Sequence, residues 1–256
     1  MPKRELNEAE KKHTKIALRL AVFFGCLLLI DFLLISIFFS WQDWVAILLF
    51  SLLFIFPGYI SNAGMVLVGG GKSIDGGRTF RDGRRILGDN KTWSGLIKGP
   101  LYIGIPISIV LFCLFLVMWP VIVEIPITGI KENEYKIYDN IMYYEYYFVG
   151  GVFPYGFMAL IIRIVLCSYG AAIGDLVGSF LKRRFDIKSG APFWVIDQLD
   201  FVIFATIITC IPAFIIPNLF WIPDLNIIVF LIILTPSVSI IANTIAYIIG
   251  LKEVPW

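Results

Sequence analysis

The stretch WVAILLFSLLFIFPGYISNAGMVLV, residues 44–68, decides the fold class of this chain. None of its 25 residues is an Asp, Glu, Lys or Arg. A helix that crosses a bilayer needs about 20 consecutive, predominantly apolar residues, and this run exceeds that length. Pro57 and Gly58 lie inside it, and transmembrane helices tolerate both residue types. The stretch therefore predicts a membrane-spanning helix.

Five further apolar stretches flank it, and together they predict an all-α integral membrane protein with about six transmembrane helices. The chain of 256 residues is 59% hydrophobic, above the roughly 45–50% of soluble domains. The first stretch follows a basic tail and lacks the small-residue cleavage site of a signal peptide, so we expect it to be retained. The predicted spans are residues 16–39, 44–68, 96–123, 150–178, 196–220 and 226–250.

The lysines and arginines are distributed unevenly between the segments that connect the spans. With the N-terminus inside, eighteen of the 21 lie in cytoplasmic segments, two in outer segments and one, Arg163, within a span. Cytoplasmic loops carry the excess of Lys and Arg, so this pattern predicts a multi-pass protein of the cell membrane with both termini cytoplasmic. The tryptophans agree, since they lie near span ends as interfacial residues do: Trp41, Trp44, Trp119 and Trp221 outside, and Trp93, Trp194 and Trp256 inside.

The longest outer segment, residues 124–149, is acidic and ends in YYEYYF. We expect these aromatic residues to rest on the outer membrane interface, and we assign them no chemistry. Arg163 and Asp31 both fall inside predicted spans and could form an ion pair.

Two cytoplasmic segments, residues 69–95 and 174–200, hold the polar residues that could carry chemistry. Because both lie on the same side of the membrane, they can converge on one site. Topology alone accounts for their cations. It does not account for the glycines or for the carboxylates among those cations, which are Asp75, Asp82, Asp89, Asp175, Asp186, Asp197 and Asp200.

Three of these carboxylates lie at the mouths of two spans. On a helix Asp175 shares a face with Lys182, seven residues later, and Asp197 shares a face with Asp200. A carboxylate at membrane depth costs a few kcal/mol unless it is paired, hydrated or metal-bound. The spacing favours Mg²⁺ held by Asp175, Asp197 and Asp200, and salt bridges to the basic residues 182–184 are the alternative.

The chain has one histidine, His13, and it lies in the N-terminal tail. This position argues against Ser-His and His-metal mechanisms. Carboxylate-held Mg²⁺ together with Lys and Arg fits phosphoryl or nucleotidyl transfer, and a phosphate nucleophile would need no general base. The sequence GGGKS at residues 69–73 is not a P-loop, because Val66 stands where the first glycine is required and no strand precedes it.

The blocks GRTFRDGRRILGDNKTWSGLIKG (residues 77–99) and GDLVGSFLKRRFDIKSGAPFWVIDQLDF (residues 174–201) resemble the signature blocks of the CDP-archaeol synthase family. These are archaeal CTP-dependent cytidylyltransferases of ether lipids. The closing NTIAYIIGLKEVPW is similar to the C-terminus of that family, and the likeness runs from about residue 44 to 256. Bacterial phosphatidate cytidylyltransferases are more distantly similar. They share a Gly-Lys-Thr-Trp element, here with Asn90 in place of the glycine, but DQLD favours the archaeal branch.

The family usually has five spans, so the resemblance implies two parts of the chain. Residues 1–42 form a basic tail and an additional transmembrane helix, and residues 43–256 form a five-helix cytidylyltransferase-like membrane domain.

The resemblance implies transfer of CMP from CTP to 2,3-di-O-geranylgeranylglycerol 1-phosphate, giving CDP-archaeol and pyrophosphate. The site would lie at the cytoplasmic face, and the lipid would enter sideways between the spans. Asp175, with Asp197 or Asp200, would hold Mg²⁺ against the triphosphate, and Lys91, Lys182 and Arg183 would neutralise charge during the transfer. Further nucleotide contacts are expected from Asp89, Asn90, Thr92 and the phosphate-clamping Arg81, Arg84 and Arg85.

Other functions remain as alternatives. A CTP-dependent polyprenol kinase would use similar substrates but release CDP. A membrane transporter is less well supported, because its polar residues should lie near the bilayer midplane, whereas here the charge gathers at one mouth. A CDP-alcohol phosphotransferase is disfavoured, since DQLDFVIFA lacks the Gly and Arg of that motif. No nucleic-acid partner is expected, and the sequence leaves the oligomeric state open.

Overall fold

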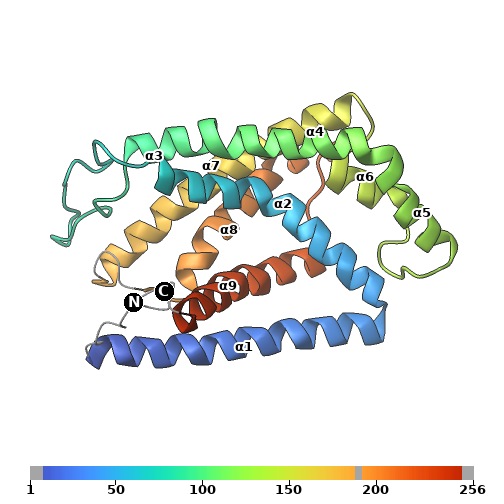
Figure 1. Ribbon diagram of the computed structural model, residues 1–256. Helices are drawn as coiled ribbons and strands as arrows, with labels where there is room; N and C mark the ends of the chain where they lie inside the picture. Colours follow the sequence, from blue (N-terminus) through green and yellow to red (C-terminus); the bar gives the residue numbers. More distant parts are fainter. Residues whose placement is uncertain (1–7, 188–191, 250–256) are drawn as a thin grey trace.

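A computed structural model describes residues 8–187 and 192–249, and in these residues the chain is helical apart from its connecting segments (Figure 1). The prediction for Trp256 falls outside these residues. The helices in chain order are α1 (Glu8–Phe38), α2 (Trp41–Leu67), α3 (Trp93–Lys98), the π-helical segment η1 (Gly99–Gly104), α4 (Ile105–Ile122), α5 (Glu124–Lys131), α6 (Ile141–Val149), α7 (Tyr155–Arg184), α8 (Ile196–Cys210), the 3₁₀ segment η2 (Ile211–Phe214) and α9 (Leu225–Ile248).

Six helices in the described part of the chain are long and apolar enough to cross a membrane, which confirms the predicted fold class. The third span joins α3, η1 and α4 into one rod from Trp93 to Ile122. The spans are Lys11–Phe38, Trp41–Leu67, Trp93–Ile122, Tyr155–Arg184, Ile196–Phe214 and Leu225–Ile248.

Four predicted span boundaries differ from the observed ones by five or six residues. The first span begins at Lys11 rather than at 16, and the fourth ends at Arg184 rather than at 178. The fifth span ends at Phe214 rather than at 220, because Pro212 and Pro217 lack the backbone N–H groups that would continue the α-helix. The fourth span begins at Tyr155 rather than at 150, because Gly150 ends α6 in a left-handed conformation with φ 90°.

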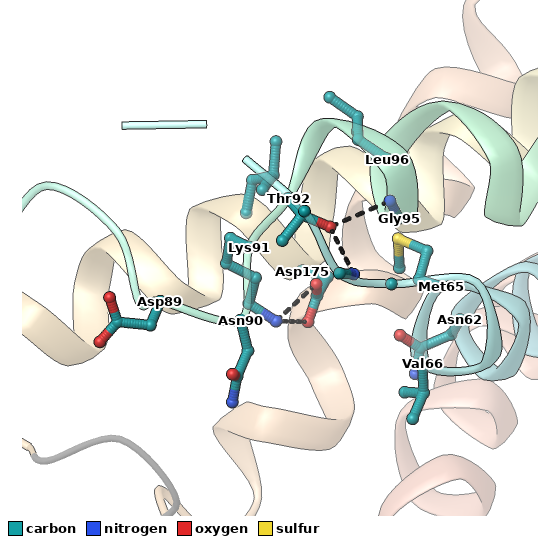
Figure 2. Close-up of a pocket in the computed structure, with 14 residues that line it drawn as sticks. Asn62, Met65, Val66, Asp89, Asn90, Lys91, Thr92, Gly95, Leu96 and Asp175 are labelled. Atoms are coloured by element: carbon teal, nitrogen blue, oxygen red, sulfur yellow. Dashed lines mark hydrogen bonds and ion pairs between the residues drawn. The ribbon is translucent and has the colours of Figure 1, made fainter. Parts of the chain in front are cut away.

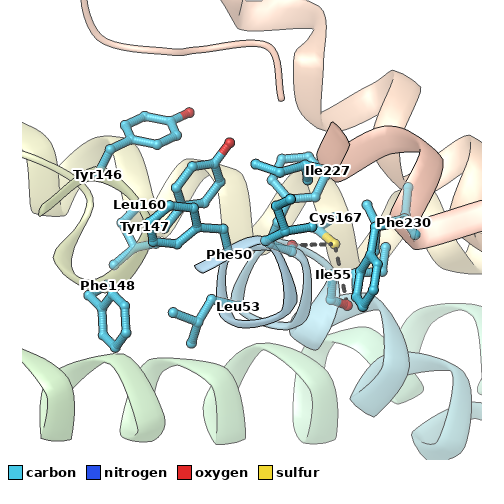
Figure 3. Packing of buried hydrophobic residues seen from close by; sticks show 14 of the residues in the cluster. Phe50, Leu53, Ile55, Tyr146, Tyr147, Phe148, Leu160, Cys167, Ile227 and Phe230 are labelled. Atoms are coloured by element: carbon cyan, nitrogen blue, oxygen red, sulfur yellow. Dashed lines mark hydrogen bonds between the residues drawn. The ribbon is translucent and has the colours of Figure 1, made fainter. Parts of the chain in front are cut away.

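The charge-free stretch that predicted the fold forms the centre of the molecule. Helix α2 contacts each of the other spans and runs between α4 on one side and α1 and α9 on the other (Figure 1). Its residues Ile47, Phe50 and Ile55 are fully buried. Figure 3 shows Phe50 and Ile55 among side chains from α6, α7 and α9. Protein neighbours rather than lipid therefore surround much of this helix.

Helices α7 and α8 approach closely because three glycines line the face of α7 that meets α8. A Cβ at Gly170 would lie 2.8 Å from Cα of Ala205, and one at Gly174 would lie 2.5 Å from the carbonyl oxygen of Asp200. A Cβ at Gly178 would overlap the carboxylate of Asp200. The glycines recur every fourth residue, the spacing that lets transmembrane helices pack backbone against backbone. This packing brings the start of α8 against the last third of α7.

The outer segment packs into the protein, so the expectation that its aromatic residues rest on the membrane interface was wrong. Tyr144, Tyr146, Tyr147 and Phe148 of α6 are buried, and the ring of Tyr147 stacks on Phe50 with centroids 4.6 Å apart. Buried aromatic side chains of this size remove a large apolar area from solvent and pair their rings, which stabilises the packing of α6 on α2.

A buried aspartate anchors this outer segment to the start of α2. Asp43 is fully buried, and its carboxylate accepts backbone N–H bonds from Lys136, Ile137 and Tyr138 at 2.9–3.1 Å. The hydroxyl of Ser40 also donates to it, at 2.7 Å. Four donors compensate for the desolvation of the charge, which explains how an acidic residue can lie in the interior.

Arg163 and Asp31 do not pair. The guanidinium of Arg163 donates from Nη1 to the carbonyl oxygen of Tyr146 at 3.0 Å and lies 4.2 Å from the centroid of that ring. Asp31 instead accepts from Nε1 of Trp44 at 2.9 Å. Each group therefore finds a local partner, and Arg163 ties α7 to α6.

The glycine stripe allows a direct test. We expect Gly174→Ala to lower the melting temperature of the detergent-purified protein, because a methyl group forced against backbone costs about 1–3 kcal/mol. Gly25→Ala on α1 is the matched control, since a Cβ there meets no atom within 4 Å and the change should be neutral or stabilising. Equal melting temperatures for the two variants would show that α7 and α8 do not need this close approach.

Candidate functional site

The segment between α2 and α3 folds as an irregular hairpin organised around one buried carboxylate. Asp75, whose side chain is 1% exposed, receives Nε and Nη2 of Arg85 at 3.0 and 3.1 Å. It also accepts backbone N–H bonds from Gly77 and Leu87, both at 3.0 Å. Backbone hydrogen bonds from Ile74 to the carbonyl of Lys91 and between neighbouring pairs close the hairpin. We call residues 69–92 the cationic hairpin.

The bidentate contact with Arg85 holds the pKa of the Asp75 carboxyl well below its usual range, and the two backbone donors lower the pKa further. Because the folded-state pKa is lowered, this carboxylate contributes stability at every pH above its ordinary value of about 3.9. The contribution declines only as the pH falls below that value towards the lowered pKa. At neutral pH the Asp75 carboxylate therefore makes its full contribution to the stability of the hairpin.

Contacts with α7 fix the position of the cationic hairpin. The N–H of Gly88 donates to Oγ of Ser179 at 3.1 Å. At the end of α7, Arg184 donates from Nη1 to Asp82 at 2.8 Å, and its guanidinium lies 4.9 Å from the ring of Phe80. The hairpin and α7 consequently form one surface.

The ion pair between Lys91 and Asp175 is the centre of the site. Lys91 lies near the end of the cationic hairpin, and its Nζ lies 2.7 and 2.6 Å from the two carboxylate oxygens of Asp175 on α7 (Figure 2). The two side chains are 25% and 24% exposed, so solvent or a ligand can reach them. The two segments predicted to converge are therefore brought together at this pair.

A cavity of about 460 Å³ opens on one side of this pair, and we call it the Thr92 cavity. Thr92 caps α3, and its hydroxyl oxygen accepts the N–H groups of Gly95 at 3.1 Å and Gly70 at 3.2 Å (Figure 2). The residues that line the Thr92 cavity are Asn62, Met65, Val66, Gly69, Gly70, Gly71, Asp89, Asn90, Lys91, Thr92, Gly95, Leu96, Asp175 and Leu176.

A second cavity of about 200 Å³ lies on the other side of the pair, and we call it the Asp200 cavity. Lys182 approaches from α7 and places its Nζ 2.7 Å from Oδ2 of Asp197 on α8. The residues that line this cavity are Gly88, Asn90, Lys91, Asp175, Ser179, Lys182, Arg183, Asp197 and Asp200. The two cavities share Asn90, Lys91 and Asp175, so ligands bound in both would meet at the ion pair.

The three carboxylates predicted to bind a metal line one cavity, but they do not converge on a point. Within residues 8–187 and 192–249, no group of three or more His, Cys, Asp or Glu side chains is close enough to hold a metal ion. Asp175 and Asp197 each contact a lysine instead. Oxygen donors of this kind suit a divalent cation. The donor chemistry and the shared cavity therefore fit such an ion, and its binding would require the two lysines to move from the carboxylates.

The four arginines predicted to contact phosphate lie in different surroundings. Arg183 lines the Asp200 cavity. Arg84 and Arg85 line neither cavity, since Arg84 donates to the carbonyl of Arg184 and Arg85 contacts Asp75 and Asp89. Arg81 is exposed, and it has no acidic partner in the part of the chain that the structure describes. The phosphate contacts expected of these last three stay a prediction.

Sequence reasoning missed several residues of the site. The glycines 69–71 were set aside when the P-loop was rejected, yet they form a wall of the Thr92 cavity. Asn62 lies one turn before the end of α2 and also lines that cavity. A polar residue near the end of a charge-free span was a signal that could have found it.

The chain matches the family model for CarS-like CDP-archaeol synthase over residues 44–129 and 138–256. It is 38% identical over 218 residues to the CDP-archaeol synthase of Thermococcus kodakarensis, covering 84% of this chain and 100% of that protein. It is 39% identical to the enzyme of Thermococcus onnurineus, covering 82% of this chain and 97% of the relative. The enzyme of Methanosarcina mazei is 37% identical, with 78% and 99% covered.

A solved structure of an intramembrane enzyme for archaeal membrane lipid biosynthesis is also similar. It is 25% identical in sequence, and the match has a TM-score of 0.43 and covers 78% of this chain and 92% of that chain.

The Asp75–Arg85 contact leads to a prediction about the hairpin. We expect Asp75→Asn and Arg85→Lys to speed proteolytic cleavage within residues 69–92 by at least about tenfold, because losing hydrogen bonds to a charged group costs about 1.5–3 kcal/mol. Arg81→Lys should cleave at the wild-type rate, since Arg81 has no such partner. Cleavage rates that are equal for Arg85→Lys and Arg81→Lys would remove Asp75 as the organiser of the hairpin.

Proposed function

This chain belongs to the CDP-archaeol synthase family, and we propose that it transfers CMP from CTP to the phosphate of an unsaturated archaeal ether lipid, 2,3-di-O-geranylgeranylglycerol 1-phosphate. The products are CDP-archaeol and pyrophosphate, which makes the chain a CTP-dependent nucleotidyltransferase. The single observation that carries the proposal is the Asp200 cavity, where three carboxylates, two lysines and an arginine meet beside a second cavity.

The chemistry follows from these charges. An oxygen of the lipid phosphate attacks the α-phosphorus of CTP and forms a new P–O bond. The bond between that phosphorus and the oxygen bridging to the β-phosphate breaks, and its electron pair leaves with pyrophosphate. The nucleophile is ionised near neutral pH and needs no general base, which suits cavities that no histidine lines.

Lys91, Lys182 and Arg183 are the cations that face the phosphates in this proposal. Preorganised positive groups lower the barrier by stabilising charge that develops in the transition state. Since Lys91 and Lys182 contact carboxylates, a triphosphate would exchange these partners for its own oxygens without leaving either lysine unpaired.

Asp175, Asp197 and Asp200 are the residues that would hold a divalent cation, and we propose Mg²⁺. When bound, such an ion supplies positive charge to the triphosphate and orients it for in-line displacement. Because Asp175 belongs to both cavities, it is the ligand nearest to the point where the two substrates meet.

The lipid has to reach the site from the bilayer, since its chains cannot leave the apolar phase. The Thr92 cavity offers apolar side chains on its wall, namely Met65, Val66, Leu96 and Leu176, and Val66 is 83% exposed on a membrane-spanning helix. We infer that the lipid enters past Val66 with its phosphate directed towards Lys91. The excess of cations on this side supports a cytoplasmic location for the site.

The experiment that tests the function uses purified protein in detergent with Mg²⁺, an ether-lipid phosphate or phosphatidate, and CTP labelled in either the α- or the γ-phosphate. We expect the α-label in the lipid product and the γ-label in pyrophosphate. Transfer of the γ-label to lipid with release of CDP would identify a lipid kinase instead. No labelled lipid under any of these conditions would overturn the proposal.

The carboxylates provide a second test. We expect Asp175→Asn, Asp197→Asn and Asp200→Asn each to lower CTP-dependent turnover by at least about tenfold, as loss of a metal ligand or of its supporting partner does. Asp186→Asn is the matched control, because that side chain is 82% exposed and lines neither cavity. Near-normal turnover in all three variants, in membranes with confirmed protein, would remove the metal hypothesis.

A further inference from the structure

Helix α1 lies outside the part of the chain that matches the family, since the match begins at residue 44. It nevertheless packs along α9 and α2. Figure 1 shows its first turns at the same end of the molecule as the cationic hairpin and the beginning of α8. A helix that only anchored the protein in the membrane would not need to contact residues near the candidate site. The contacts of the first turns of α1 therefore show whether α1 also supports that site.

The first turns of α1 contact the segment that leads into α8. The imidazole of His13 packs on the indole of Trp194, with ring centroids 5.7 Å apart and planes inclined by 39°. Trp194 has a φ of 43°, a left-handed conformation that a bulky residue rarely adopts. Surrounding contacts must hold such a residue in place. His13 is one of those contacts.

The turn that contains Trp194 orients Asp197. The N–H of Phe193 donates to Oδ2 of Asp197 at 3.0 Å, and the N–H of Asp197 donates to the carbonyl of Trp194 at 3.2 Å. The same Oδ2 lies 2.7 Å from Nζ of Lys182 in the Asp200 cavity. The direction of this carboxylate therefore depends on the backbone of residues 193 and 194.

The turn of residues 193 and 194 contacts both α7 and α1. The ring of Phe193 packs on Phe185 at the end of α7, with centroids 5.6 Å apart, while Trp194 packs on His13 of α1. Helix α7 also carries Lys182, so the Phe185–Phe193 contact and the Lys182–Asp197 ion pair both join this turn region to the same helix. The contact with His13 joins the turn to an element outside the family match.

We propose that His13 is a positioning residue for cytidylyl transfer: by packing on Trp194 it holds the turn whose Phe193 N–H orients Asp197 towards Lys182. The proposal rests on the proposed function. It assigns α1 a role in the site, and it depends on the ring of His13 rather than on its protonation.

The full-length protein allows the proposal to be tested with five variants: His13→Ala, His13→Phe, Trp194→Ala, the double variant His13→Ala/Trp194→Ala, and Lys15→Ala as a control on the same helix. Turnover of α-labelled CTP into lipid, the KM for CTP and the melting temperature are measured for each. We expect His13→Ala to lower kcat by about tenfold, the lower end for groups that orient a ligand. The KM for CTP and the melting temperature should stay near the wild-type values.

The other variants separate positioning from general stability. His13→Phe keeps a ring against Trp194 and should retain most of the turnover, and Lys15→Ala should match the wild type. The double variant should be no slower than Trp194→Ala, because residues that act in series are not additive. Wild-type turnover in His13→Ala, a His13→Phe variant as slow as His13→Ala, or additive losses in the double variant would each overturn the proposal.

Hydrogen exchange keeps the test independent of the reaction. If His13 holds the turn, His13→Ala will speed exchange of the amides of residues 193–199 and leave those of the cationic hairpin unchanged. Unchanged exchange at 193–199 overturns the positioning role. A wild-type protein that makes no labelled lipid while His13→Ala still speeds this exchange would instead overturn the proposed function.

Discussion

The close approach of α7 and α8 is the constraint on which the site depends. Gly170, Gly174 and Gly178 remove the side chains that would separate the two helices. The backbone of α8 occupies the space beside the first two, and the carboxylate of Asp200 occupies the space beside Gly178. The same approach places the carboxylates of Asp175 and Asp200 in one cavity. Like charges at membrane depth repel and lose hydration, so such an arrangement needs both rigid packing and nearby cations.

Lysines supply those cations, and the cationic hairpin determines where one of them lies. Asp75 and Arg85 hold the interior of the hairpin, and the contact between Gly88 and Ser179 docks it on α7. Lys91, near the end of the docked hairpin, is thereby held where its Nζ reaches Asp175. A flexible loop would leave this lysine in solvent, and the half-buried carboxylate of Asp175 would lose its cationic partner.

At the opposite end of the molecule, around α6 and the start of α2, buried charges are likewise held by partners from other segments. There the fully buried Asp43 accepts hydrogen bonds from backbone donors and a hydroxyl, while Arg163 donates from Nη1 to a carbonyl and lies over an aromatic face. Every one of these charges connects two segments distant in sequence. The buried charges therefore connect segments of the bundle through specific hydrogen bonds, which fix the relative positions of helices that apolar packing alone would leave less well defined.

The amino-acid sequence by itself determined the class of fold, the number of spans and the pairing of two polar segments, because long apolar runs can be satisfied only as helices in a bilayer. It also predicted Asp175, Lys91 and Lys182 as candidates, from carboxylates at span ends and from the resemblance of two sequence blocks to a family, and the structure places all three around the Asp200 cavity. Only the tertiary structure decided that Arg84 and Arg85 hold the hairpin, that the tyrosines of α6 are buried, and that His13 reaches Trp194. Those outcomes depend on contacts between residues far apart in the chain, and no local pattern of spacing or hydropathy encodes which partner a side chain will find.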